Sequence, residues 1–140
     1  MCILKNGRFI ILDIVRGQWS ADVREANIKR TAEADGRIVS IGIEQEGGSG
    51  GKESAEATVR RLSGFVTIKD KPVGDKVFRA DPFSVQVNEG NVSMMYGAWN
   101  VDYLDELQNF PISTYKDQVD ASSGAFMMLT GKRNAKVGRR

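Results

Sequence analysis

The chain has 140 residues, 41% of them hydrophobic and 27% charged, which are the proportions of an ordinary globular protein. They exclude an extensively disordered chain, and no apolar run approaches the ~18 residues of a membrane-spanning helix. With 20 basic and 18 acidic side chains the net charge is +2, and this excess depends on the last nine residues, which contain five basic and no acidic side chains. These residues could bind phosphate or form a solvated terminus, so the charge alone does not identify a partner.

Histidine is absent and Cys2 is the single cysteine. Without imidazole there can be no Ser-His-Asp or Cys-His catalysis and no histidine-containing zinc site. One cysteine excludes an internal disulfide and is typical of a protein of the reducing cytoplasm. The first residues also lack a secretory signal pattern, because Lys5-Asn6-Gly7-Arg8 interrupts the apolar start. Any catalytic chemistry must therefore use carboxylates, lysines and hydroxyls.

The chain begins with a predicted β-hairpin. Asn6-Gly7 separates two apolar runs, residues 2–5 and 8–15, and Asn-Gly is the strongest short signal for a hairpin turn. The second run is apolar at nearly every position, so we expect both of its faces to be covered.

Helices and strands then alternate. The expected helices run from the N-cap Ser20 to Asp35, through Ala55–Leu62, over Gly74–Glu89 with a break or kink at Pro82, from about Asn100 to Pro111, and from about Asp117 to Leu129. Strands are expected within residues 37–44, 65–69 and 92–96. This order predicts an α/β sandwich with a mixed sheet. We expect residues 1–131 to form one domain and residues 132–140 a basic, flexible tail.

The apolar spacing also predicts which side chains of the last two helices are buried. In the helix from Asn100 these are Tyr103, Leu104 and Leu107. In the last helix the expected buried set is Ala121, Ala125, Met128 and Leu129.

Glu44 is the most informative carboxylate, because it ends an apolar strand. Catalytic and ligand-binding groups of α/β sheets gather outside the carboxyl ends of strands. An exposed strand end before a flexible turn is the alternative, and spacing alone does not separate the two readings. The turn that follows is rich in glycine but is not a Walker A motif, because Glu46 replaces its first glycine and Glu53 its hydroxyl residue. A phosphate could still meet Lys52 and the next helix N-terminus.

Two further groups could carry chemistry. Asp117 and Asp120 open the last helix and fall along one margin of its apolar face, although acids in a first turn also complement the helix dipole. Near the start of an earlier helix, Lys76 and Arg79 share a face at i and i+3. They could pair with acids or hold a DNA phosphate, and the pattern does not separate these roles.

Five sequence blocks, taken together and in order, resemble the nuclease domain of tailed-phage DNA-packaging terminase large subunits. The resemblance covers residues ~8 to 130. The blocks are Ile11–Ser20, Ile43–Lys52, Gly74–Ala80, Gly90–Val92 and Asp117–Ala121.

The resemblance implies an RNase H-like fold, with a mixed sheet that begins as an antiparallel meander and is flanked by helices on both faces. It also implies a cytoplasmic, Mg²⁺- or Mn²⁺-dependent endonuclease that cuts concatemeric double-stranded DNA by a two-metal mechanism. In the complete protein the expected partners are the terminase small subunit and the portal, with no membrane.

Carried over to this chain, the resemblance implies that Glu44, Asp117 and Asp120 are catalytic metal ligands. Lys76, Arg79 and Lys52 are the expected DNA-binding residues. Tyr115-Lys116-Asp117 stands where the family usually has His-Asp-Asp, which places a cation beside the site.

The family's first strand, which carries its principal metal-binding aspartate, would precede the Asn6-Gly7 hairpin. The chain is therefore expected to lack that strand, to have impaired activity, and to self-associate through its open sheet. A non-catalytic nucleic-acid-binding or assembly module of the same fold is the alternative, and an unrelated α/β scaffold is a third.

Overall fold

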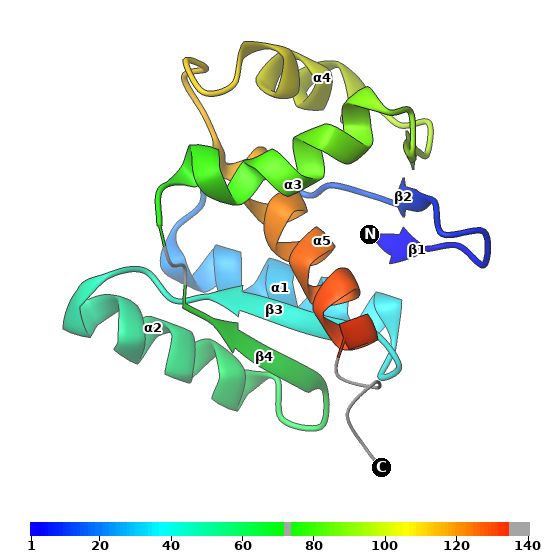
Figure 1. Ribbon diagram of the computed structural model, residues 1–140. Helices are drawn as coiled ribbons and strands as arrows, with labels where there is room; N and C mark the ends of the chain where they lie inside the picture. The colour runs from blue at the N-terminus through cyan, green and yellow to red at the C-terminus, as the bar shows by residue number, and fades with distance from the viewer. Residues whose placement is uncertain (72–73, 135–140) are drawn as a thin grey trace. The chain divides into compact units, whose positions relative to one another are not determined.

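The computed structural model describes residues 1–71 and 74–134 (Figure 1). The chain divides into two compact units: unit 1 contains residues Met1–Arg16 and Gly74–Arg140, and unit 2 contains Gly17–Val73. In the described residues, five helices and five strands form; helices alternate with strands after an opening hairpin, until α4 and α5, which follow each other directly. The predicted α/β class is therefore confirmed.

The sheet of unit 1 contains β1 (Cys2–Ile3), β2 (Phe9–Ile11) and β5 (Val92–Met94). Strands β1 and β2 are antiparallel, and β2 pairs in parallel with β5. The predicted hairpin is therefore confirmed, and Gly7 adopts a φ of 85° in its turn, a conformation that glycine adopts without strain. Strand β2 ends at Ile11, however, and Leu12 and Val15 are about half exposed. The expected cover on both faces does not extend along the whole apolar run.

Three helices complete unit 1: α3 (Lys76–Asn88), α4 (Asn100–Asn109) and α5 (Asp117–Asn134). The carboxylate of Asp75 caps α3, because it accepts a hydrogen bond from the Phe78 amide at 2.8 Å. Helix α3 continues through Pro82 without a break. Helix α5 extends to Asn134, so the expected tail begins as helix, and its residues 135–140 lie outside the described part of the chain.

The core of unit 1 joins its sheet to its three helices. It is built from Phe9, Ile11, Phe83, Tyr103 and Phe126. The Phe126 ring of α5 lies 4.9 Å from the Phe9 ring and 5.9 Å from the Phe83 ring, measured between centroids. These tilted aromatic contacts connect β2, α3 and α5.

Two predictions of burial were wrong. Leu104 is 47% exposed although Tyr103 beside it is buried. In α5 Ala121 is exposed, and the buried face is formed by Gln118, Val119, Ser122, Ser123 and Phe126. The buried face of α5 therefore contains polar side chains, and the spacing of apolar residues does not predict such a face.

Unit 2 contains α1 (Ala21–Asp35), β3 (Ser40–Glu44), α2 (Gly48–Arg61) and β4 (Val66–Asp70). Strands β3 and β4 are parallel and are connected through α2, which makes a β-α-β unit. An ion pair between Lys69 Nζ and Glu56 Oε1, at 3.6 Å, joins β4 to α2. Ser20 precedes α1 as predicted, although its side chain makes no capping hydrogen bond.

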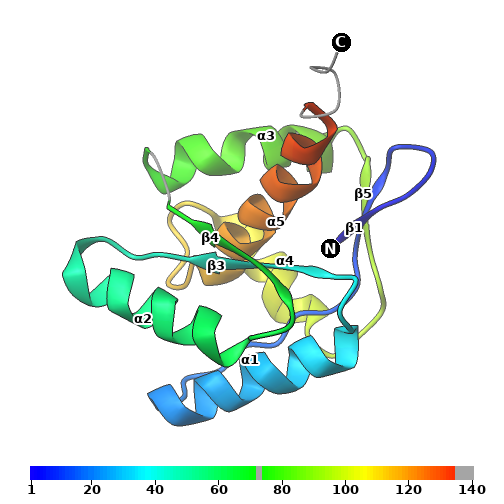
Figure 2. The same ribbon diagram turned by 90° about the horizontal axis from the view of Figure 1, so that it is seen from below.

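Glu25 of α1 links the two helices of unit 2. Figure 2 shows α1 and α2 next to each other, and the Thr58 hydroxyl donates to Glu25 Oε1 at 2.9 Å. Arg61 approaches the other carboxylate oxygen at 3.3 Å. These polar contacts supplement a small apolar core of Ala32, Ala55 and Leu62.

The described strands form two small sheets, one in each unit, whereas the resemblance implied one mixed sheet. No helix within residues 1–71 and 74–134 is long and apolar enough to cross a membrane.

Candidate functional site

Two of the sequence blocks meet where α3 packs against α5. Lys76 Nζ, in the Gly74–Ala80 block, lies 2.5 Å from Asp120 Oδ2, in the Asp117–Ala121 block. The Asp120 side chain is 7% exposed and the Lys76 side chain 49% exposed. The lysine therefore reaches from the surface to a buried carboxylate, and this ion pair is the centre of the candidate site in unit 1.

The two aspartates of α5 have different environments. Asp117 is exposed at the start of the helix, whereas Asp120, three residues later in the same first turn, is buried. The Asp120 amide donates to the Lys116 carbonyl at 3.0 Å, so Lys116 contributes the first helical acceptor. Asp117 can present its carboxylate to a ligand in solvent, while Asp120 is held by Lys76.

Arg79 follows Lys76 by one turn of α3 and is only 7% exposed. A buried guanidinium is poorly placed to contact a DNA backbone directly. Of the two roles expected for Arg79, orienting neighbouring groups therefore fits its position better than holding a phosphate.

Glu106 of α4 fixes the start of α5. Its Oε1 atom accepts hydrogen bonds from the backbone amides of Gln118 at 2.8 Å and Val119 at 2.9 Å. Its Oε2 atom accepts from the Gln118 side-chain amide at 2.7 Å. The first amides of a helix have no partner within the helix, and a carboxylate there also complements the helix dipole. Glu106 therefore holds in place the turn that carries Asp117 and Asp120.

Glu106 was not among the residues predicted from the sequence to carry function. The signal was available, because Glu106 lies three residues after the buried Tyr103 and next to the partly buried Leu107. A carboxylate on the apolar face of an amphipathic helix needs a hydrogen-bonding partner, and here the partner is the next helix.

In unit 2 the structure places a second carboxylate beside Glu44. Glu44 and Asp70 are register partners at the carboxyl ends of the parallel strands β3 and β4. Register partners in adjacent parallel strands have their side chains on the same face of the sheet. The Gln45 amide donates to the Asp70 carbonyl at 2.7 Å, which extends the pairing beyond the last ladder residues. Asp70 was missed because strand register cannot be inferred from one strand alone.

The glycine-rich segment after Glu44 forms the first turn of α2, which begins at Gly48 with Gly47 as N-cap. A Cβ atom at Gly51 would lie 2.3 Å from the Glu46 carbonyl oxygen, so this close approach requires glycine. Lys52 lies in this turn and is exposed. Unit 2 thus brings Glu44, Asp70 and a helix N-terminus to one end of its sheet.

The expected site residues are divided between the units. Asp117, Asp120, Lys76 and Arg79 belong to unit 1, and Glu44 and Lys52 belong to unit 2. Among the described residues, no three carboxylate or cysteine side chains gather closely enough to hold a metal ion. The acid pair of unit 1, with one member bound to lysine, does not supply by itself the carboxylate set that two divalent ions require.

Comparisons of the chain with protein-family models, with curated proteins and with solved structures found no match.

Proposed function

We propose that this chain is a metal-dependent endonuclease domain of the phage terminase large-subunit type, with an RNase H-like fold and reduced activity. Its substrate would be concatemeric double-stranded DNA, and its cofactor Mg²⁺ or Mn²⁺. Hard divalent ions prefer oxygen ligands, which suits a chain that has no histidine.

The observation that carries this proposal is the ion pair between Lys76 and Asp120. The resemblance assigns Gly74–Ala80 and Asp117–Ala121 to one site although they are distant in sequence. Their contact between α3 and α5 is what a shared site requires.

In this proposal the exposed Asp117 is a candidate metal ligand of unit 1, and Glu44 is a candidate metal ligand of unit 2. Asp70 is added as a candidate companion of Glu44, because the two are register partners. Lys76 positions Asp120 and neutralises it, and Arg79 orients the surrounding groups. Lys52 remains the candidate for a DNA phosphate, since it is exposed in the first turns of α2.

The charge of unit 1 bears on how DNA would approach. Unit 1 carries 11 basic and nine acidic side chains, a net charge of +2, and five of the basic residues lie within residues 132–140. Without those five, the rest of the unit has a net charge of −3, a sign that repels a phosphate backbone unless a bound cation intervenes. In this proposal DNA therefore approaches unit 1 through its basic C-terminal residues or through bound divalent ions.

A non-catalytic nucleic-acid-binding or assembly module is the second candidate. It is favoured by the ion pair that occupies Asp120, since a carboxylate bound to lysine is less available to a metal ion. The expected partners are unchanged for either candidate: DNA, the terminase small subunit and the portal, in the cytoplasm of a host cell. Self-association of this chain also stays part of the proposal, because Val66 and Ile68 of β4 are 51% and 37% exposed.

Manganese binding tests the proposal. We expect Mn²⁺ titrated into the protein to raise its thermal stability, since a ligand that binds the folded state stabilises it. The increase should shrink in Asp117→Asn and in Glu44→Gln, while Asp81→Asn, which changes an exposed acid of α3, should behave as wild type. An equal response in all four proteins would contradict the assigned ligands, and no response would favour the non-catalytic module.

A further inference from the structure

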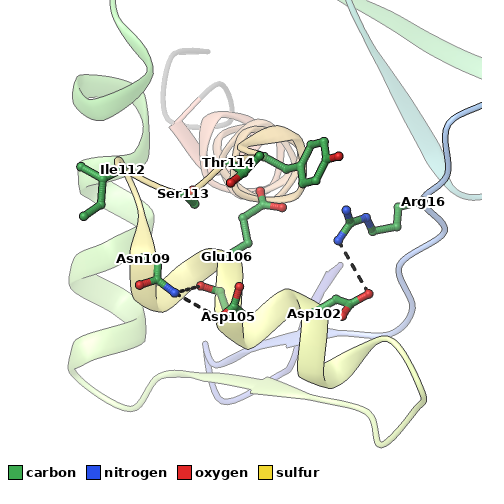
Figure 3. Close-up of a pocket in the computed structure, with 9 residues that line it drawn as sticks. Arg16, Asp102, Asp105, Glu106, Asn109, Ile112, Ser113 and Thr114 are labelled. Atoms are coloured by element: carbon green, nitrogen blue, oxygen red, sulfur yellow. Dashed lines mark hydrogen bonds and ion pairs between the residues drawn. The ribbon is translucent and has the colours of Figure 1, made fainter.

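A cavity of about 500 Å³ lies in unit 1 between α4 and the segment that leads to α5 (Figure 3). Its lining includes Arg16, which follows β2, three carboxylates of α4, and Ser113 and Tyr115 of the connecting segment. The cavity is distinct from the Lys76–Asp120 pair, since neither Lys76 nor Asp120 lines it, although Glu106, which caps α5, does.

The lining has an excess of negative charge. Asp102, Asp105 and Glu106 contribute three carboxylates, and Arg16 is the one cation among the residues that line the cavity, which leaves two negative charges. Glu106 is 4% exposed and already accepts hydrogen bonds from the start of α5. Glu106 therefore contributes the electrostatic field of its negative charge to the cavity, whereas Asp102 and Asp105 are exposed and can contact a ligand directly.

Arg16 indicates which kind of group the cavity holds. Its guanidinium carbon lies 5.1 Å from the centre of the Tyr115 ring, and Nη1 lies 3.7 Å from Asp102 Oδ2. An aromatic face beside a carboxylate is a recognised arrangement for an organic cation. The Arg16 guanidinium thus occupies part of this cation-binding arrangement.

The rest of the cavity offers further polar groups. The Asp105 carboxylate accepts a hydrogen bond from the Asn109 side-chain amide at 3.1 Å and is exposed. The Ser113 hydroxyl oxygen is buried and has no hydrogen-bond partner among the described residues. A buried hydroxyl without a partner is uncommon in a folded protein, and a ligand in the cavity would supply one.

We propose that this cavity binds a small organic cation, an alkylguanidinium or primary alkylammonium group, in competition with Arg16. The cation pairs with Asp102 and Asp105 and lies against the Tyr115 ring, and a polar end of the ligand reaches the Ser113 hydroxyl. The group could come from a free small molecule or from an arginine or lysine side chain of a partner protein. This proposal is independent of the nuclease proposal.

Calorimetric titration of the full chain with agmatine, which carries both cationic groups, tests the proposal. We expect binding with a Kd on the order of 1 mM or tighter. Arg16→Ala should strengthen binding about two- to fivefold by removing the internal competitor, the range that one exposed ion pair supports. Asp102→Asn and Asp105→Asn should each weaken it by a similar factor, and both residues are exposed, so the variants should fold. Asp81→Asn is the matched acid outside the cavity and should not change binding.

The neutral analogue 1,4-butanediol should not bind. A Gly-Arg-Gly peptide with blocked ends distinguishes the two sources: tighter binding than agmatine indicates a partner's side chain, and weaker binding indicates a free cation. The proposal is overturned if neither agmatine nor the Gly-Arg-Gly peptide binds. It is also overturned if the Kd for agmatine is the same in Asp102→Asn, Asp105→Asn and the wild type.

Discussion

Lys76 of α3 and Asp120 of α5 form an ion pair in which the nitrogen and oxygen atoms lie 2.5 Å apart. The pair joins two helices that are separated in sequence by β5 and α4. It gives the buried Asp120 carboxylate a compensating charge, which a buried acid requires. The same contact brings together the sequence blocks on which the functional proposal depends.

Loss of Lys76 should destabilise the protein. In Lys76→Ala the buried Asp120 carboxylate loses its cation, and we expect a decrease of about 1–2 kcal/mol in the free energy of unfolding, less than for a fully buried pair because Lys76 is half exposed. Urea denaturation measures this difference. Lys5→Ala, which removes an exposed lysine of the hairpin turn, should change stability by less than about 0.5 kcal/mol. Equal stability of the two variants would show that the ion pair contributes nothing.

Replacement of Glu106 should be more damaging. Glu106→Ala leaves two backbone amides and a side-chain amide at the start of α5 without their acceptor, and a loss of about 2–4 kcal/mol is expected. The neighbouring Asp105→Ala, at an exposed position of the same helix, serves as the control. Chemical denaturation measures the free energy of unfolding of both variants. The same small loss in Glu106→Ala and in Asp105→Ala would contradict the capping role of Glu106.

Local sequence signals predicted the elements of this fold well. Asn6-Gly7 marked the hairpin, Ser20 the start of α1, and Pro111 the end of α4. Each of these signals acts through the backbone conformation of a few adjacent residues, so no tertiary information was needed.

Features that depend on tertiary contacts were not predictable in this way. Asp70 became a neighbour of Glu44 only through the register of β3 and β4, and Glu106 caps a different helix from its own. The buried face of α5 is partly polar because Ser122 meets the Tyr103 hydroxyl and Gln118 meets Glu106. Apolar spacing alone therefore assigned Ala121 to the wrong face.

Tyr103 should make the stability depend on alkaline pH. Its burial raises the pKa of the phenol to about 12, the hydrogen bond with Ser122 opposes this shift, and the Glu106 charge adds to it. Because the folded-state pKa exceeds the unfolded value of 10.0, this contribution to stability is complete below pH 10 and is lost as the pH rises to 12. The decrease should reach about 2–3 kcal/mol in denaturation curves recorded across this range.

Tyr103→Phe should remove that part of the alkaline dependence. It also removes the hydrogen bond to Ser122, which lowers stability near neutral pH by about 1 kcal/mol. The same decline between pH 10 and 12 in Tyr103→Phe and in the wild type would contradict the assignment to Tyr103.

Cleavage of supercoiled plasmid DNA in the presence of Mn²⁺ tests the proposed endonuclease function most directly. We expect slow conversion to nicked and linear DNA, which stops on chelation of the metal and is lost in Asp117→Asn and Glu44→Gln, but not in Asp81→Asn. Conversion that continues unchanged in Asp117→Asn and Glu44→Gln, or the absence of any metal-dependent cleavage by the wild-type chain, would contradict it.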